Sequence, residues 1–539
     1  MKKLIYLIIV AFVFMGCGNF LNKTPDNRAE LSTPKDIASL LVAAYPQQNH
    51  VWFTELRSDN TTDVGPTAPA DDATRRQSYY WQRVEAQSQD TPDGFFFSTY
   101  GSIAAINHAL QAIEKMEKEG TYSKKETDPL RGEALVARAY NHFMLVNLFA
   151  EHYDPATAAT YPAIAYVTTV EDRPIMDYER LTVEQVYNLI EKDLLEGLSL
   201  IADDSYSQPK WHFNKKAANT FASRFYLFRG LYQTDDNGED DWDKVIRYAN
   251  LALEGKPESF LRDWSSTYRL SMDAFGTEYS RSTNRANFLI CSNISVMTRN
   301  WYYRYTMDLD LLRARTANKS THPINDTKFE YLLSYKGAGA ASLGCYNVFK
   351  FNEIFKRDGI NANFGYPYVM YTPIVAEEAL FNLMEAYTIK ERYDDVLDLF
   401  NKYYAARIKD YNTPAAGSDY SVTNLTIEMK YGGNKLENWP QLTPHFISRL
   451  SQKQIVYLTC IVNVRASEFV GEGHRWFDIK RMHIPVTHKI YPTTQMVLEP
   501  NDPRRVINLP AEAEAHIYDN GNINRVQAET MFPVSTIID

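Results

Sequence analysis

The sequence contains few cysteines, and their spacing excludes both a disulfide framework and a zinc site. Four cysteines occur in 539 residues, and Cys17 is the first of them, at the end of an apolar leader. The other three are an odd number without the short spacings of metal ligands, and they are Cys291, Cys345 and Cys460. We therefore expect these three to be small buried apolar residues, and the sequence predicts no metal site.

The chain also lacks the excess of positive charge that nucleic-acid binding requires. Lysine and arginine number 57 against 67 aspartates and glutamates, so the formal net charge is −10 at pH 7. Affinity for a phosphate backbone depends on clustered lysine and arginine. We therefore exclude nucleic acid as a partner.

Motifs of several common enzyme classes are missing as well. Phosphate-binding Gly-Lys-Ser or Gly-Lys-Thr runs and the Gly-x-Ser-x-Gly motif do not occur, and Gly337, Gly339 and Gly344 do not have the spacing of a dinucleotide-binding loop. The sequence thus implies no cofactor, and a structural calcium ion stays an open alternative. A glycoside hydrolase on a helical scaffold also stays open, because its chemistry needs only two carboxylates at a defined separation. No acidic motif stands out, so we predict a protein that is not an enzyme.

The N-terminal residues have the pattern of an export signal of the lipoprotein type. A short basic start is followed by an apolar run over 4–15, which is too short to span a bilayer comfortably and ends at Gly16-Cys17. We predict a signal peptide over 1–16, acylation of Cys17, and a lipidated tether over 17–30. The rest of the chain has a globular composition, with 45% hydrophobic and 23% charged residues.

Aromatic residues are abundant, with 37 Tyr, 27 Phe and 8 Trp. They become dense between about 259 and 371, where the helical period fades, and irregular segments on a rigid scaffold often carry binding residues. Tyr and Trp offer an apolar face with a polar tip, which suits a sugar ring. The candidate ligand contacts are Trp81, Trp264, Trp301 and Tyr303, followed by Tyr80, Tyr302 and Tyr305. The alternative for each one taken singly is a place in the core, which is the commoner fate of such residues.

Helical periodicity dominates outside that region. Thr33-Pro34 and Thr182-x-x-Gln185 have the patterns of helix N-termini. Apolar residues recur at helical spacing along 131–150 and along several other stretches. Similar small-residue and aromatic patterns recur in pairs of these helices, which is typical of tetratricopeptide-like hairpins.

The segment from Glu468 to Met482 combines large aromatics with complementary charges. As one helix it places three apolar residues near one face: Phe469, Trp476 and Ile479. It also places three charged residues three apart, where they can pair: Glu472, Arg475 and Asp478. Such a helix is expected to lie between other elements, because isolated buried charges are costly.

This segment closely resembles the E-G-H-R-W-F-D-x-x-R signature of the SusD/RagB family, outer-membrane nutrient-binding lipoproteins of Bacteroidetes. The matching residues are Glu472, Gly473, His474, Arg475, Trp476, Phe477, Asp478 and Arg481. The resemblance covers nearly the whole mature chain and gives the signature residues a structural role. It implies a mainly α fold with minor β, in which about four tetratricopeptide-like helix pairs carry long irregular loop insertions.

The resemblance also implies a domain organisation and a function. A SusD-like domain would span 31–539, with an N-terminal helical part at about 31–258, a loop-rich insertion at about 259–371 and a C-terminal helical part at about 372–539. The protein would be a cell-surface lipoprotein of the outer membrane, anchored through Cys17, that binds an oligosaccharide and delivers it to a SusC-like TonB-dependent transporter. The same architecture binding peptides is the alternative.

Overall fold

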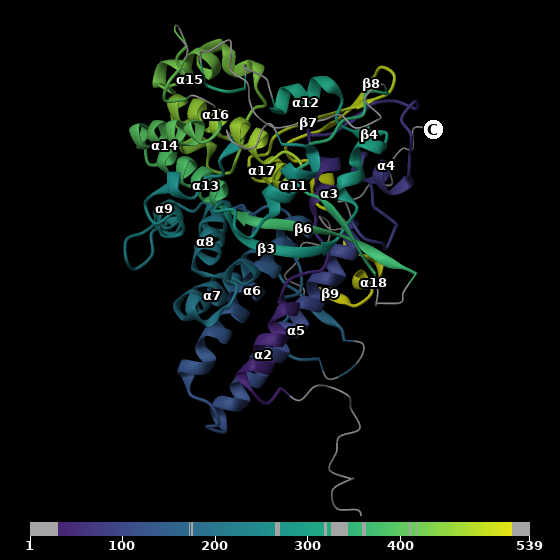
Figure 1. The fold of residues 1–539 in the computed structure, drawn as a ribbon, viewed down its shortest axis with the longest axis vertical. Coiled ribbons are helices and arrows are strands. Elements are labelled where there is room, and N and C mark those ends of the chain that lie inside the picture. The colour runs from purple at the N-terminus through teal and green to yellow at the C-terminus, as the bar shows by residue number, and fades with distance from the viewer. Residues whose placement is uncertain are drawn as a thin grey trace, which may run out of the picture.

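The fold is mainly α-helical with little strand, as predicted (Figure 1). It is known from a computed structural model, which describes residues 31–519 except 172, 174–175, 265–269, 317–320, 325–342, 358–362, 409–410, 415 and 417. The expected signal peptide, Cys17 and the tether lie outside the described residues. No helix within the described ranges is both long enough and apolar enough to cross a membrane.

Most of the helices pack against one another as hairpins and layers. Their bounds are α2 (Pro34–Leu41), α3 (Val51–Arg57), α4 (Ala73–Tyr79), α5 (Pro92–Lys118), α6 (Lys124–Phe149), α7 (Val183–Leu200), α8 (Lys215–Arg229), α9 (Asp241–Ala252), α11 (Met272–Ser280), α12 (Leu309–Thr316), α13 (Ala376–Ile389), α14 (Tyr393–Ala405), α15 (Asn424–Tyr431), α16 (Gln452–Glu468), α17 (His474–Arg481) and α18 (Ala511–Glu514). Helix α6 packs on α5 and α7, α8 on α9, and α13 on α9, α14 and α16. Short turns join α5 to α6 and α13 to α14, which makes these pairs helical hairpins.

Capping explains where several of these helices begin. Thr33 accepts from the backbone N–H of Asp36 at 3.2 Å, and the Asp36 carboxylate accepts from the N–H of Thr33 at 2.9 Å. Thr182 and Gln185 form the same reciprocal pair at α7. Both N-termini predicted from the sequence are therefore confirmed, and each cap stabilises its helix by about 1 kcal/mol.

The strands form one small sheet and three short pairs. Their bounds are β1 (Thr62–Asp63), β2 (Tyr178–Arg180), β3 (Asn287–Ile294), β4 (Tyr305–Thr306), β5 (Glu353–Arg357), β6 (Gly365–Val375), β7 (Val486–Ile490), β8 (Thr494–Leu498) and β9 (Ile517–Asp519). Strand β6 lies between β3 and β5 in an antiparallel sheet. The other pairs are β1 with β4, β2 with β9, and β7 with β8.

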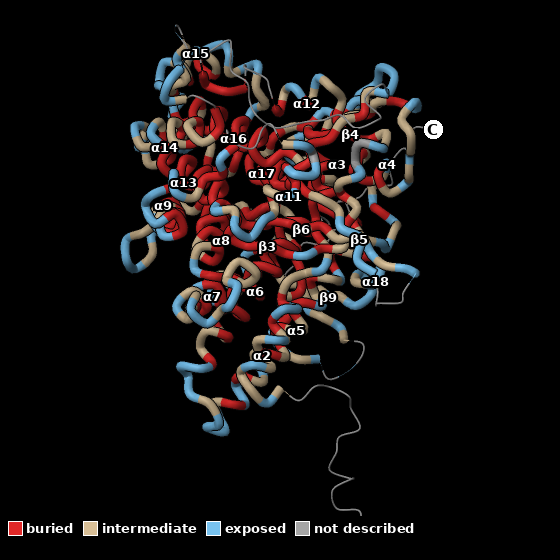
Figure 2. The backbone as a smooth tube through the Cα atoms, in the orientation of Figure 1, coloured by how far each residue is buried: buried red, intermediate tan, exposed pale blue. Residues whose placement is uncertain are grey.

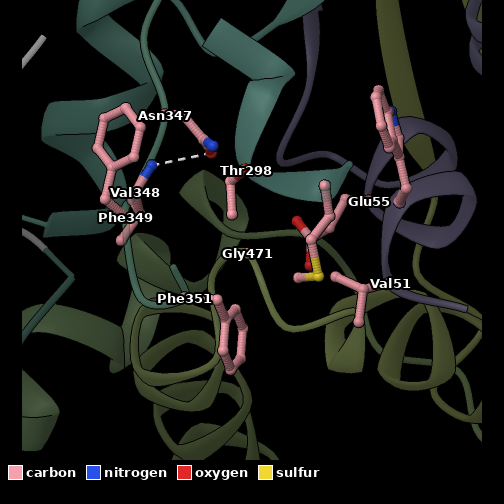
Figure 3. Close-up of a pocket in the computed structure, with 10 residues that line it drawn as sticks. Val51, Glu55, Thr298, Asn347, Val348, Phe349, Phe351 and Gly471 are labelled. Atoms are coloured by element: carbon pink, nitrogen blue, oxygen red, sulfur yellow. Dashed lines mark hydrogen bonds between the residues drawn. The ribbon is translucent and has the colours of Figure 1, made fainter. Parts of the chain in front are cut away.

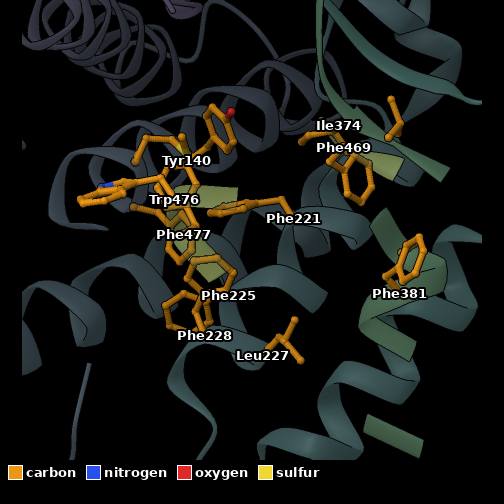
Figure 4. Close-up of a cluster of buried hydrophobic side chains, with 14 of the residues drawn as sticks. Tyr140, Phe221, Phe225, Leu227, Phe228, Ile374, Phe381, Phe469, Trp476 and Phe477 are labelled. Carbon is orange, nitrogen blue, oxygen red and sulfur yellow. The ribbon is translucent and has the colours of Figure 1, made fainter. Parts of the chain in front are cut away.

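The core is continuous and aromatic (Figure 4). Phe143 on α6 packs against Phe221 and Phe228 on α8, with ring centroids 5.4 and 5.2 Å apart. Phe228 in turn contacts Phe477 on α17 at 6.2 Å. Such pairs contribute about 1 kcal/mol each beyond the burial of apolar area. The contact between Phe228 and Phe477 therefore joins the signature helix α17 to the helical hairpins.

The signature segment differs from the single helix expected over Glu468–Met482. Helix α16 ends at Glu468, and Gly471 and Gly473 adopt φ values of +78° and +79° before α17 begins at His474. Residues other than glycine rarely adopt such a φ. A Cβ at Gly473 would also lie only 2.8 Å from the Thr54 hydroxyl oxygen. The one-helix prediction was wrong because these glycines allow the chain to turn where another element packs against it.

Candidate functional site

Two segments that are more than two hundred residues apart in the sequence meet at one edge of the molecule. Strand β1 pairs with β4, and an isolated bridge joins Ala70 to Tyr303. The 3₁₀-helix η5 (Met297–Tyr302) leads into this pairing from one side, and α4 precedes Tyr80 on the other. Six of the seven aromatic residues predicted as ligand contacts lie on these elements or directly after them, and Trp264 lies elsewhere.

Trp81 and Tyr305 belong to the core of this region, with exposed fractions of 2% and 0%. The imidazole of His488 lies between the rings of Tyr79 and Trp81, at centroid distances of 4.1 and 4.3 Å. The indole N–H of Trp81 donates to the carbonyl oxygen of Arg57 at 2.8 Å. The Arg504 guanidinium also lies 5.3 Å from the centroid of the Trp81 ring. Trp81 is therefore covered, supports the surface and presents no ring to a ligand.

Trp264 is also buried, at 1% exposure, and packs against Phe275 and Tyr279. The backbone of Trp301 lies in η5, and its side chain is outside the described residues. The sequence could not separate these cases, because a tryptophan pattern does not reveal which neighbours cover the ring.

Three of the predicted residues reach solvent. Tyr302 is exposed at 46%, whereas Tyr80 and Tyr303 are half-buried. The guanidinium of Arg75 lies between the rings of Trp52 and Tyr303, 3.6 and 3.4 Å from their centroids. This cation–π sandwich holds Tyr303 in place beside Tyr302, with the two ring centroids 5.9 Å apart.

Sequence reasoning missed one exposed aromatic in the same region, Tyr491. Its ring lies against Gly65, where a Cβ would be only 2.8 Å away, and its backbone N–H donates to the Asp63 carboxylate at 3.0 Å. Asp63 also accepts two hydrogen bonds from Arg304, at 2.8 and 2.9 Å. Only the contact of the β7–β8 hairpin with β1 brings Tyr491 here. We call Tyr80, Tyr302, Tyr303 and Tyr491, together with Asp63 and Arg304, the aromatic surface.

A pocket between α3, η5 and residues 347–351 lies next to this surface (Figure 3). Its lining includes Trp52, Glu55 and Thr298, and its volume is about 30 Å³. A space of this size holds one or two water molecules and is too small for a sugar ring. Burial raises the pKa of the Glu55 carboxyl, although hydrogen bonds from Asn60 and Gly473 oppose the shift. A large ligand would therefore have to bind on the open surface rather than in this pocket.

The signature residues are buried and do not reach the aromatic surface. Arg475 makes two hydrogen bonds of 2.8 Å to Asp59, Arg481 makes two of 2.6 Å to Glu385, and Lys350 bonds to Glu472 at 2.5 Å. Burial alone would raise the pKa of Asp59, but Arg475 and Arg315 outweigh it and hold that pKa well below its usual range. We call these pairs, with Asp478 and Arg465, the α17 cluster.

The prediction that Glu472, Arg475 and Asp478 pair with one another was wrong, since each bonds to another partner. Glu472 and Arg475 bond to Lys350 and Asp59 instead of to each other, because Gly473 separates them from a common helix face. Asp478 and Arg481 do pair, at 2.8 Å. His474 stacks on Phe469 with a centroid distance of 4.3 Å, and burial lowers its pKa well below the usual value.

The three remaining cysteines are buried and free, as the sequence predicted. Within the described ranges, no three His, Cys, Asp or Glu side chains are grouped to hold a metal ion.

A family model for SusD-like proteins matches residues 19–227, and its description is starch-binding, associating with outer membrane. No curated protein is similar enough in sequence to match the chain.

Solved structures show the same fold over most of the chain. A SusD superfamily protein from Bacteroides fragilis is 16% identical, with a TM-score of 0.60 over 92% of this chain and 99% of that one. A SusD-like carbohydrate binding protein from Bacteroides vulgatus is 15% identical, with a TM-score of 0.58 over 94% and 99% of the two chains. A third, a SusD superfamily protein from Bacteroides thetaiotaomicron, is 16% identical, with a TM-score of 0.57 over 90% and 99%. Residues 19–227 thus resemble the SusD-like family in sequence, and the chain as a whole has the fold of the SusD superfamily structures.

Proposed function

We propose that this protein is a non-catalytic lipoprotein of the outer membrane that binds a nutrient glycan on the aromatic surface and delivers it to a SusC-like TonB-dependent transporter. The observation that carries the proposal is the set of solvent-exposed tyrosine rings, Tyr302 and Tyr491, held beside the Arg304–Asp63 ion pair. Sugar rings have apolar C–H faces and polar hydroxyl edges, so they need apolar platforms with hydrogen-bonding groups nearby.

The preorganisation of the surface supports this function. Tyr303 is fixed by the Arg75 sandwich, and Tyr491 by its contact with Gly65. A platform whose rotamers are already held loses little conformational entropy when a ligand binds. The description of the matching family model, starch-binding, agrees with a carbohydrate ligand.

The shape of the site favours a chain of sugars over a single one. The pocket beside the surface is too small for a ring, so one sugar would be covered on only one side. Several units lying across the open surface would each add a ring contact. We therefore propose an oligosaccharide as the ligand.

Isothermal titration calorimetry with a panel of oligosaccharides and peptides tests this proposal. We expect saturable binding of at least one oligosaccharide, about fivefold weaker in Tyr302→Ala and in Tyr491→Ala, because each lost ring contact contributes on the order of 1 kcal/mol. Tyr518→Ala is the matched control, since Tyr518 is 52% exposed on β9, outside the aromatic surface. Equal losses in the control variant would contradict the site.

The same mixtures distinguish the alternatives. Binding of peptides but of no oligosaccharide would mean that the ligand is a peptide, bound on the same scaffold. Release of shorter sugars from the panel, detected by chromatography, would contradict a non-catalytic role and favour a hydrolase.

The membrane anchor is tested separately. We propose acylation of Cys17 and expect Cys17→Ala to move the protein from the outer-membrane fraction to a soluble fraction, because an acyl chain supplies about 0.8 kcal/mol per buried CH₂. Retention of the variant in the membrane would contradict the anchor and leave the glycan proposal unaffected.

A further inference from the structure

The β5–β6 hairpin concentrates exposed apolar side chains on a sheet edge. Fourteen large hydrophobic residues of the described chain are exposed, and four of them lie within thirteen positions: Ile354, Phe355, Phe364 and Tyr366, at 52, 58, 63 and 47%. Figure 2 colours β5 mostly as exposed residues, and β6 extends to the side of the molecule in Figure 1. A local group of this kind marks an interaction surface more often than single scattered residues do.

Strand β5 is also open along its outer edge. It pairs only with β6, and no other strand among the described residues pairs with it. An edge strand presents backbone N–H and C=O groups that can pair with an added strand. The side chains of β5 then alternate across the two faces, with Ile354 and Lys356 on one and Phe355 and Arg357 on the other.

The charge of the edge determines what can be added to it. Glu353 is bound to Arg299 in an ion pair, so the exposed, unneutralised charges on β5 are those of Lys356 and Arg357, for which no ion pair with a described residue is found. The whole chain is acidic, with a net charge of −10. Two copies of β5 side by side would bring like charges together, whereas an acidic strand would be attracted.

We propose that β5 is the docking edge for an extended, acidic segment of a partner protein, which adds to the sheet as a further strand. The inference deepens the proposed function, because it assigns the partner to a specific edge. Glu353 is bound to Arg299, and Arg299 lies on η5, three residues before Tyr302. A partner strand on β5 therefore lies beside the aromatic surface, where a captured glycan can pass between the two proteins.

The test uses the full chain and a fluorescein-labelled eight-residue peptide that alternates glutamate with valine. Fluorescence polarisation should show saturable binding that weakens as salt rises, and no binding of the matching lysine–valine peptide. We expect at least about tenfold weaker binding in Lys356→Glu/Arg357→Glu, since attraction becomes repulsion. The matched control is Lys115→Glu/Lys118→Glu, which reverses two exposed charges on α5.

Hydrogen exchange distinguishes strand addition from charge attraction. The amides of 353–357 should gain protection when the acidic peptide binds, while those of α5 should not. Absence of binding, equal losses in the control variant, or binding without protection of β5 would each overturn the proposal.

Calorimetry with the glycan separates this inference from the function on which it rests. The charge-reversed β5 variant should keep wild-type glycan affinity. If the wild-type protein binds no glycan, the proposed function is overturned. If it binds glycan but not the acidic peptide, only the docking edge is overturned.

Discussion

Aromatic and charged side chains occur together in two regions of this molecule, around helix α17 and on the aromatic surface. In the α17 cluster, every signature residue is buried, and Arg481 lies within 2.6 Å of both carboxylate oxygens of Glu385. On the aromatic surface, Tyr302 and Tyr491 are nearly half exposed. The same residue types therefore join helices in one place and face solvent in the other.

The difference follows from what each region would lose if a side chain were removed. A buried charge without its partner keeps its desolvation cost, so its loss destabilises the fold strongly. An exposed ring contributes little to folding and can contact a ligand. The comparison thus predicts that stability and binding can be changed separately.

The largest effect on stability is expected in the α17 cluster. Arg481→Met leaves Glu385 and Asp478 buried without their main cation, so we expect the free energy of unfolding to fall by about 3–5 kcal/mol. Urea denaturation measures this loss. Arg392→Met is the control, because Arg392 and Asp395 are both 46% exposed and their pair contributes about 0–1 kcal/mol. A similar loss in both variants would contradict the claim that the buried ion pairs of the α17 cluster matter more for stability than exposed ones.

The next largest effect is a loss of stability in acid. Burial lowers the pKa of His50 to about 3 and that of His488 to about 4, so the folded protein holds both neutral at pH values where the unfolded chain is protonated. Their contribution is complete above the unfolded pKa of about 6.5 and falls as the pH drops toward those values. Burial raises the pKa of Asp90 to about 6, and this group opposes part of the fall.

We expect the free energy of unfolding to decrease by at least about 1 kcal/mol between pH 7 and pH 5. Urea titrations at several pH values measure it. His488→Gln should reduce the slope, because one of the titrating groups is gone. An unchanged slope would show that His488 does not titrate on unfolding.

A loss of stability of similar size is expected at the turn before α17. Gly473→Ala should lower the free energy of unfolding by about 1–3 kcal/mol, because φ is +79° and the new Cβ meets Thr54 and His50 within 3 Å. Gly238→Ala is matched in φ, at +78°, and has open space around it. Thermal unfolding of the two variants separates backbone strain from crowding, and equal losses would mean that Thr54 and His50 give way.

The smallest change in stability is expected on the aromatic surface. Tyr302→Ala and Tyr491→Ala should alter the free energy of unfolding by less than about 0.5 kcal/mol, since both side chains are nearly half exposed and lie outside the core. Urea denaturation checks this. A loss above about 2 kcal/mol would mean that these rings, like that of Trp81, support the fold.

Much of the fold could be predicted from the sequence. Helices α2 and α7 begin directly after Thr33 and Thr182, the capping residues that the sequence indicated. Such caps can be recognised in a sequence because they depend on side chains three positions apart. The break at Gly473 was missed, because its cause is the packing of α3 against α17 rather than any local pattern.

The candidate site was predicted less completely. The sequence offered the aromatics near 80 and near 301–305, together with Trp264, as candidate contacts, and β1–β4 pairing places the first two groups at one edge. It could not show that Trp81 would be covered by His488, or that Tyr491 would join them, because both contacts depend on the β7–β8 hairpin.

The sequence by itself determined the helical class and the residues of the signature motif, because these depend on local spacing and on motif identity. Only the tertiary structure decided which rings face solvent and which charges are paired. Arg475 meets Asp59 across more than four hundred residues, and Tyr302 is exposed while Tyr305, three residues later, is buried. Exposure and pairing are set by whichever distant element packs nearby, and a pattern read along one chain does not contain that information.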